Sequence, residues 1–361
     1  MSATFGERLR VTVFGQSHSE AMGAVVDGLP AGLRIDTEHL RAFLARRAPG
    51  QGPLTTARRE PDAPEIVAGL ADGVTCGAPL CILIRNTDAR SRDYETLRRV
   101  VRPSHADYPA YVRFGGHNDI RGGGQFSGRL TAPLCAAGAV ALQCLAARGV
   151  GVYAHIASIA GIKDAAVDPV SPDLPALAAL AAKPLPVLDA RAGEAMAQAV
   201  RDAAADGDSV GGVVECVVTG LPAGVGEPLY DSVESRLAAL LFAVPAVKGV
   251  EFGAGFAAAA LRGSENNDGY TASGGEVRTL SNHSGGICGG LTTGMPVVFR
   301  AAFKPTPSIA RPQRTVALPG PEETTLTVGG RHDPCVVPRA VPVVEAVAAL
   351  TMYDLLLCAA L

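Results

Sequence analysis

An internal repeat limits what this chain can fold into more than any other feature of its sequence. The segment VVDGLPAGL at residues 25–33 returns as VVTGLPAGV at residues 217–225, and each copy precedes a stretch with apolar residues at helical spacing. A second pair follows in the same order, GVTCGAPLCILIR at 73–85 and GLTTGMPVVFR at 290–300. Two ordered matches favour an old duplication. The sequence therefore predicts a pseudo-twofold structure with a functional site where equivalent loops meet.

Alternating and helical patterns occur in both halves, so the residues alone predict an α+β fold with a pseudo-repeat. Strands are expected near residues 8–14, 22–28, 80–85, 150–160, 210–219 and 295–301. Helices are expected near residues 37–46, 131–148, 192–206, 231–243 and 342–358. Two segments rich in Ala, Pro or polar residues are expected to be surface loops, 165–190 and 311–325. The apolar segment 342–361 must be buried in the core or in a subunit interface.

Composition excludes several classes of protein. With 48% apolar and 19% charged residues the chain is globular, and at 361 residues one elaborate domain or two modest ones are both open. A net charge of −3 gives no positive field to recruit nucleic acid or an anionic membrane. The first residues lack the apolar stretch of a signal peptide. The uncharged stretch 130–147 contains Pro133, Gly138 and Gln143, which favours a buried helix over a membrane span. Eight cysteines without a CxxC pair indicate a reducing compartment and no zinc site.

Two segments combine histidine with polar neighbours. FGQSH at 14–18 follows an apolar strand pattern, and its glycine allows a sharp turn that exposes Ser17 and His18. A hydrolase elbow would need glycine two residues after the serine, where this chain has Ser19. In RPSHADY at 102–108, His105 can titrate near neutral pH. A polar loop with a solvated histidine is an equal alternative for each segment.

The segment RGGGQFSGR at 121–129 leads into the helix expected from Thr131. Glycines let backbone N–H groups approach a ligand, and the start of a helix favours an anion. The arginines at its ends offer fork-shaped donors for phosphate or carboxylate. The segment lacks the G-K-[ST] of a Walker motif. We expect an anion site here in preference to a plain tight turn.

Two later segments add further candidates, and a plain structured loop is an equal alternative for each. HSGGICGG at 283–290 precedes KPTPS at 304–308, where Lys304 stands in an apolar neighbourhood near hydroxyl groups. GRHDPC at 330–335 places Arg, His and Asp on a loop stiffened by proline. Taken together, the five segments predict a site for an anionic substrate and a phosphate-bearing cofactor.

The motifs identify a family. G-x-S-H, RRxPG, RPxHADY, RGGG-x-x-S-x-R, SNHxGGIxGG, KPTxS and GRHDPC follow one another in family order, and the chain resembles the chorismate synthases from about residue 6 to 357. The resemblance implies a phosphate lyase that converts 5-enolpyruvylshikimate 3-phosphate to chorismate by trans-1,4-elimination, the last step of the shikimate pathway. It also implies obligatory reduced FMN without net redox change.

The resemblance implies an architecture and partners as well. We expect a single domain over residues 1–361, a β-α-β sandwich with helices packed between sheets, which assembles as a homotetramer in the cytoplasm. The sequence shows no appended domain that could reduce flavin. We therefore expect the FMN to be reduced by an external flavin reductant, with NADPH or another compound as the source of electrons. No nucleic acid and no membrane partner are expected.

Site residues carry over position by position from the family motifs. His18 corresponds to the histidine beside the substrate phosphate and His105 to the one beside the flavin ring, while Ser17 and Asp333 correspond to the pair that relays a proton from the flavin. An aspartate beside an arginine suits a proton acceptor. The substrate's anionic groups are assigned to Arg47, Arg102 and Arg129, with Arg331 as a further arginine of this kind. The flavin site is assigned to Gln125, Phe126, Ser127, Pro245, Ala246, Gly289, Lys304, Pro305, Thr306, Pro307, Ser308 and Arg331.

The chain departs from the family pattern at several motif positions. Where RGGGRSSARET is common, it has Gln125, Phe126, Gly128 and Leu130. Pro245 stands where Asn is frequent, Pro53 replaces an arginine after the PG turn, and Ser19 replaces a glycine. His18, His105 and Asp333 match the motifs, which predicts an active enzyme. Two other classes stay open, a flavin-binding module without lyase activity and a phosphate-handling enzyme without flavin, such as a phosphatase.

Overall fold

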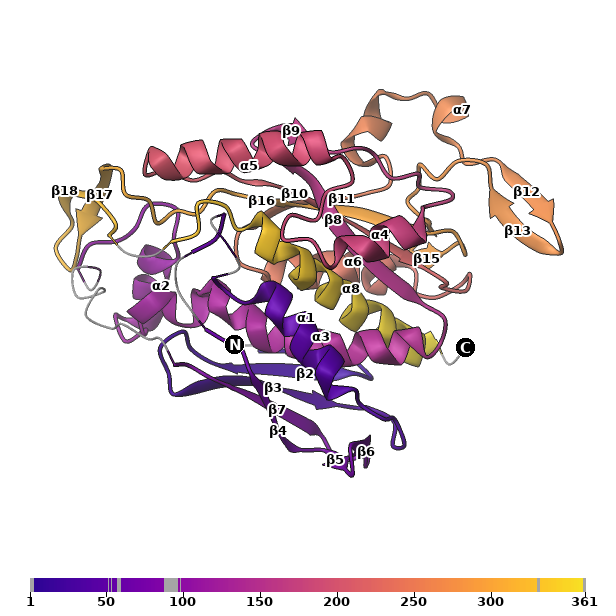
Figure 1. Cartoon of the computed structure of the whole chain (residues 1–361), viewed down its shortest axis with the longest axis horizontal. Coiled ribbons are helices and arrows are strands. Elements are labelled where there is room, and N and C mark those ends of the chain that lie inside the picture. The colour runs from indigo at the N-terminus through magenta and orange to yellow at the C-terminus, as the bar shows by residue number, and fades with distance from the viewer. Residues whose placement is uncertain are drawn as a thin grey trace.

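Two five-stranded antiparallel sheets enclose helices α1, α3, α6 and α8 in this computed structural model (Figure 1). The structure describes residues 3–50, 52, 54–56, 60–87, 97, 99–329 and 332–359. Helices packed between sheets are the α+β sandwich that the family resemblance predicted.

The first sheet buries one face of each central strand. Met22, Ala24 and Val26 alternate along one strand, and Leu80, Ile82 and Ile84 along its neighbour, all with at most 1% exposure. Period-two alternation of this kind places one face of the sheet in the core. The strand order is β1 (Thr4–Phe5), β2 (Arg10–Gly15), β3 (Ala21–Asp27), β7 (Leu80–Arg85) and β4 (Pro64–Ala68).

The second sheet covers the opposite side of the helices. Val214, Cys216 and Val218 of its central strand belong to the same apolar core as the first sheet's buried residues. Its strand order is β11 (Val247–Phe252), β16 (Val297–Phe303), β10 (Gly212–Thr219), β8 (Gly151–Ile159) and β9 (Ile162–Lys163).

The repeat predicted from the sequence is confirmed by the topology. The order β2-β3-β7-β4 in the first sheet corresponds to β8-β10-β16-β11 in the second. Register agrees too, since Val25 pairs with Cys81 as its equivalent Val217 pairs with Val298.

The turn after each central strand is held in the same way in both halves. Thr75 Oγ1 donates to Pro30 O at 2.6 Å, and its equivalent Thr292 Oγ1 donates to Pro222 O at 2.6 Å. A threonine in T-x-G-x-P thus closes the GLPAG turn twice. The GLPAG and T-x-G-x-P motifs of each half are therefore in direct contact.

The helix layer contains α1 (Thr37–Arg47), α3 (Thr131–Ala146), α6 (Val233–Ala243) and α8 (Val337–Ala359). Side-chain oxygens of Asp36 and Ser232 accept backbone N–H groups at the starts of α1 and α6. Two stretches are long and apolar enough to cross a membrane, Gly128–Ala146 and Val337–Ala359. They are 72% and 89% buried within the molecule, as core helices are. The predicted burial of the C-terminal segment is confirmed for residues 342–356, and residues 357–359 are half-buried.

Helix α8 begins at Val337, five residues before the predicted start, so Pro342 lies inside it. Pro338, the second residue of α8, removes no intrahelical hydrogen bond, because the first N–H groups of a helix have no intrahelical acceptor. Pro342, the sixth residue, removes one. Two buried acids fix this helix. Glu345 pairs with Arg46 at 2.5 Å, and Asp354 accepts the backbone N–H groups of residues 7–9 at 2.8–3.2 Å.

Both segments predicted as surface loops contain regular structure, which corrects that expectation. Segment 165–190 holds α4 (Leu174–Leu180), capped by Asp173, and 311–325 holds most of the hairpin β17 (Gln313–Ala317) and β18 (Glu322–Leu326). Other helices and strands are α2 (Asp107–Phe114), α5 (Ala190–Ala205), α7 (Gly263–Asn266), β5 (Leu70–Ala71), β6 (Val74–Thr75), β12 (Tyr270–Ser273), β13 (Glu276–Thr279), β14 (Ile287–Cys288) and β15 (Leu291–Thr292). Short 3₁₀ turns are η3 (Arg121–Phe126), η4 (Gly128–Leu130), η5 (Leu229–Asp231) and η6 (Gly255–Ala260).

Candidate active site

A cavity of about 540 Å³ lies where equivalent loops of the two halves meet. The end of α1 contributes Arg47 and the loop after it Pro49, and the corresponding segment after α6 contributes residues 244–247. Helices α3 and α8 both begin at this cavity, with Thr131 and Arg339 in its wall. The unpaired N–H groups of a helix start carry partial positive charge, so the framework favours anions.

Arg47 and Arg129 are held together by the carboxylate of Asp62. Arg47 donates to Oδ2 and Arg129 to Oδ1 of this residue, and Arg129 Nε also donates to Asn86 Oδ1 at 3.1 Å. Both arginines line the cavity although they are only 2% and 4% exposed. Burial lowers the pKa of Arg129, and the neighbouring Asp62 opposes that effect. Because Asp62 fixes both guanidinium groups, their remaining N–H donors can bind a phosphate or a carboxylate.

Arg102, His105 and Asp107 form a second cluster at the start of α2. Arg102 Nε and Nη2 donate to Asp107 Oδ2 and Oδ1 at 2.7 and 2.8 Å, and His105 Nδ1 lies 2.6 Å from Oδ1. Burial opposes ionisation of Asp107, but hydrogen bonds from Arg102 and His105 outweigh it and hold its pKa well below the ordinary value. Arg102 and His105 both line the cavity.

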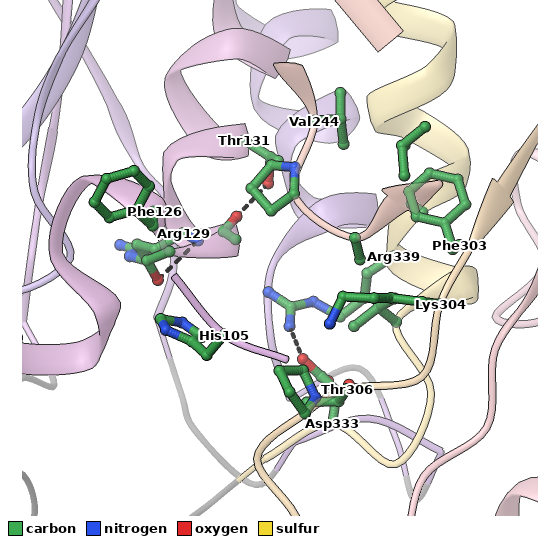
Figure 2. Close-up of a pocket in the computed structure, with 18 of the residues that line it drawn as sticks. His105, Phe126, Arg129, Thr131, Val244, Phe303, Lys304, Thr306, Asp333 and Arg339 are labelled. Atoms are coloured by element: carbon green, nitrogen blue, oxygen red, sulfur yellow. Dashed lines mark hydrogen bonds and ion pairs between the residues drawn. The ribbon is translucent and has the colours of Figure 1, made fainter. Parts of the chain in front are cut away.

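Asp333 is held on the opposite wall by an arginine and a backbone amide. Arg339 Nη1 lies 2.5 Å from Asp333 Oδ2, and Thr56 N donates to Oδ1 at 2.8 Å. Arg339 Nε also donates to the backbone carbonyl of Arg47 at 3.0 Å, which links the two clusters. Figure 2 shows Asp333, Arg339 and Lys304 across the cavity from His105 and Arg129.

Lys304 extends the positive charge of that wall. Its Nζ donates to Ser104 O at 2.9 Å, and burial together with the nearby Lys248 lowers its pKa. Both lysines line the cavity. A second cation close by makes charge on Lys304 costly, and an anionic ligand between them would relieve that cost.

Ser17 and His18 do not line the cavity, and both pack against Gly122 of the RGGG segment. Gly122 and Gly123 have φ of +60° and +86°, and a β-carbon on Gly122 would overlap both the His18 ring and Ser17 Oγ. Glycine is therefore required there for backbone conformation and for close approach. Ser17 is fully buried, and its hydroxyl has no hydrogen-bond partner among the residues that the structure describes.

Comparison with known proteins decides the family. The chorismate synthase family profile matches residues 9–357. The chorismate synthase of Methanocella arvoryzae is 48% identical over 97% of this chain and 93% of its own length, and that of Aeropyrum pernix is 49% identical over 98% and 92%. A crystal structure of chorismate synthase superposes with a TM-score of 0.77 at 27% identity, covering 98% of this chain and 92% of the other.

The chain belongs to the chorismate synthase family. Its activity is that of the family, a carbon–oxygen lyase that releases phosphate from 5-enolpyruvylshikimate 3-phosphate at the last step of the shikimate pathway.

Most residues that the family motifs assigned to the site do line this cavity. They are Arg47, Arg102, His105, Gln125, Phe126, Ser127, Arg129, Pro245, Ala246, Lys304, Thr306, Pro307, Ser308 and Asp333. Pro305 does not line it, and Gly289 lies in the turn between β14 and β15, also outside the lining. Arg331 lies outside the described residues. Within the described part of the chain, Arg339 forms an ion pair with Asp333.

Sequence reasoning missed several residues at this site. Asp62 and Lys248 carried no motif, and Arg339 follows the GRHDPC motif without being assigned a role. The repeat offered a usable signal for Lys248, because the VPAVKG loop corresponds to the RRAPG loop that carries Arg47. Nothing local in the sequence marks Asp62 as the partner of arginines 15 and 67 residues away.

The cavity residues fit a flavin mononucleotide. Phe126, Phe242 and Phe303 supply apolar surface for a planar ring, and Lys304 and Lys248 supply charge for a phosphate. The buried Thr306 Oγ1 has no hydrogen-bond partner within the described part of the chain, and a polar ligand atom would satisfy it. Among the described residues no group of three or more His, Cys, Asp or Glu could hold a metal ion.

Proposed function

We propose that this chain carries out the chorismate synthase reaction in the cavity between α3 and α8, with reduced FMN as its cofactor. One observation supports this placement above the others: arginine pairs, a histidine and a carboxylate from separate segments converge on one cavity. The substrate carries one phosphate and two carboxylates, and the guanidinium groups of Arg47, Arg102 and Arg129 suit such anionic groups.

The substrate loses a proton and a phosphate in this reaction and gains one carbon–carbon double bond, so it is neither oxidised nor reduced overall. When bound, reduced FMN supplies the electron density that lets phosphate leave from a centre whose C–H bond is not acidic. The residues of the chain must position both ligands, exclude water and move protons.

Arg47, Arg102 and Arg129 bind the anionic groups of the substrate in this proposal. Each guanidinium is fixed by an aspartate, so little side-chain freedom is lost when the ligand binds. His105 and Asp333 hold or accept protons at opposite walls of the cavity. Ser17 and His18 act from behind the glycine segment, as the family motifs imply. The flavin contacts are assigned to residues 125–127, 245–246 and 304–308, with Gly289 and Arg331 as motif-based assignments.

One incubation separates this proposal from its two alternatives. The chain is mixed anaerobically with chemically reduced FMN and 5-enolpyruvylshikimate 3-phosphate, and both chorismate and phosphate are quantified. We expect equal amounts of the two products. Phosphate without chorismate would indicate a phosphatase, and neither product would indicate a flavin-binding module without lyase activity.

We also propose a cytoplasmic homotetramer of single-domain subunits that depends on an external reductant, NADPH or another, for its flavin. The continuous apolar core supports one domain, since it runs from Leu9 to Leu356 through both sheets. Phe14 and Val67, on the first sheet, remain 37% and 54% exposed, which favours association through this sheet. Light scattering on the purified chain should give the mass of four subunits, and a monomer mass would contradict the assembly. NADPH alone, without added reductase, should not support turnover.

A further inference from the structure

The carboxylate of Asp107 contacts two different functional side chains at once. It is 7% exposed and is the first residue of α2. Oδ2 accepts Arg102 N at 3.0 Å and Arg102 Nε at 2.7 Å, while Oδ1 accepts Arg102 Nη2 at 2.8 Å. His105 Nδ1 lies 2.6 Å from the same Oδ1. Both oxygens are therefore committed to Arg102 and His105.

The position of the proton on His105 follows from these contacts. Nδ1 faces Asp107 Oδ1 at 2.6 Å and Arg102 Nη2 at 3.1 Å, so it either donates to the carboxylate or accepts from the guanidinium. The contact with the carboxylate is shorter, and Nη2 already donates to that oxygen. A hydrogen bond to an ionised acceptor is also the stronger of the two. Nδ1 therefore carries the proton, and the neutral ring keeps its lone pair on Nε2.

The other ring nitrogen lies at the glycine segment of the cavity wall. A β-carbon on Gly123 would be 3.2 Å from His105 Nε2, and His105 itself lines the cavity. Figure 2 shows the imidazole beside Arg129 and below Phe126. Nε2 is thus available to a ligand, because Asp107 occupies only the opposite edge of the ring.

We propose that Asp107 is a positioning residue that fixes His105 as the Nδ1–H tautomer, so that Nε2 accepts a hydrogen bond or a proton in the cavity, and that also fixes the plane of Arg102. When Nε2 takes up a proton, the ring becomes an imidazolium whose charge Asp107 balances. Arg102 keeps Nη1, 3.5 Å from Ser308 Oγ, for a ligand. This inference rests on the proposed placement of the reaction in this cavity.

A purely structural role for Asp107 is the competing explanation. An acid in the first turn stabilises a helix, and Ala106 provides no side-chain cap for α2. If the role were purely structural, Asp107→Asn would lower kcat by the same factor whether or not position 105 is a histidine. The two explanations therefore differ in whether the effects of the two residues are independent.

The test is a double-mutant cycle with Asp107→Asn and His105→Gln in the full chain, assayed for chorismate with reduced FMN. We expect Asp107→Asn to lower kcat about 10- to 100-fold in the wild-type background and less than about twofold in the His105→Gln background. KM for the substrate should rise in both backgrounds, because Arg102 is released in both.

Glu65→Gln is the matched control. Glu65 Oε1 accepts a hydrogen bond from Arg85 Nε at 3.0 Å, so this pair is also an acid that holds an arginine, but neither residue lines the cavity. It should leave kcat within about twofold of wild type. Thermal unfolding of each variant confirms folding. Should Asp107→Asn not fold, Asp107→Glu keeps the charge at the helix start, lengthens the side chain by one methylene and is expected to show the same pattern.

Equal loss of kcat in both backgrounds, or no loss in the wild-type background, would overturn the inference while leaving the proposed function intact. A wild-type chain that forms no chorismate would overturn the proposed function and this inference with it.

Discussion

Acidic residues of the cavity hold its basic residues in place. Asp62 bridges Arg47 and Arg129, Asp107 grips Arg102, and Asp333 contacts Arg339. An arginine that is buried without a partner would be costly, and an arginine on a flexible side chain would bind its ligand weakly. A fixed carboxylate beside each arginine both balances its buried charge and restricts its side chain. The N–H donors that do not contact the carboxylate stay available to the ligand.

Asp333 is expected to act as a proton acceptor and not merely as the anchor of Arg339. Asp333→Asn keeps size and shape but cannot take a proton. Turnover should fall roughly 10²-fold or more, while FMN and substrate bind nearly as in the wild type. Steady-state kinetics and calorimetry on this variant provide both quantities.

Arg339→Gln is the companion variant, because it removes the anchor and leaves the carboxylate. It should weaken substrate binding more than turnover. Should Asp333→Asn weaken binding as much as it slows turnover, Asp333 only orients Arg339.

Arg129 is expected to bind an anionic group of the substrate. Arg129→Ala should cost roughly 2–4 kcal/mol of substrate binding, because charge-assisted hydrogen bonds in a closed site are stronger than neutral ones. Calorimetry with the substrate measures the loss. Arg85→Ala is the control, since Arg85 is exposed at the end of β7, where it pairs with Glu65 and Glu20. Unchanged affinity in Arg129→Ala would remove Arg129 from the substrate site.

At the scale of elements, helices α3 and α8, whose first turns line the cavity, pack closely against each other. A β-carbon on Gly138 of α3 would overlap Ala346 of α8, so the two helices touch through small residues. This contact sets where both helix starts lie, and with them Thr131 and Arg339.

Gly138→Ala should therefore destabilise the fold by about 1–3 kcal/mol, the usual cost of overpacking a core. Urea unfolding would show a lower midpoint. Gly263→Ala is the control, because a β-carbon there meets nothing within 4 Å. A midpoint for Gly138→Ala equal to that of the control would show that the helices separate freely.

Local patterns in the sequence predicted three of the four repeated strands in each half, because strand alternation, GLPAG turns and amphipathic helices are local features. They did not predict the fourth strands, β4 and β11. They missed α4 and the β17–β18 hairpin, whose segments lack strong periodicity. They also could not reveal that Asp62 meets Arg129 or that Arg339 meets Asp333. Such contacts depend on how α1, α3 and α8 pack, which becomes visible only in three dimensions.

At the scale of the whole molecule, a row of ionisable side chains runs across the strands of the second sheet. His155, Glu215, Arg300 and Glu251 stand in register on β8, β10, β16 and β11, with contacts of 2.7–3.1 Å. Burial disfavours charge on His155, but hydrogen bonds and charges of Asp164 and Glu215 outweigh it and raise its pKa to about 9. His155 can donate to Asp164 and Glu215 at the same time only while its ring is protonated.

Stability should consequently fall at alkaline pH. The pKa of His155 is raised above the unfolded value of about 6.5, so its contribution is complete below that pH and is lost as pH rises through about 9. Between pH 6 and pH 9.5 the free energy of unfolding should drop by on the order of 2 kcal/mol more in the wild type than in His155→Gln. Urea titrations at both pH values measure this difference. Parallel pH profiles of the two proteins would show that His155 does not titrate in this range.

The cavity as the place of reaction is tested most directly by a crystal structure of the chain with oxidised FMN and 5-enolpyruvylshikimate 3-phosphate. We expect both ligands in the cavity between α3 and α8, with the substrate's anionic groups on Arg47, Arg102 and Arg129 and the flavin against Lys304 and Phe126. Either ligand bound elsewhere, with this cavity empty, would contradict the account.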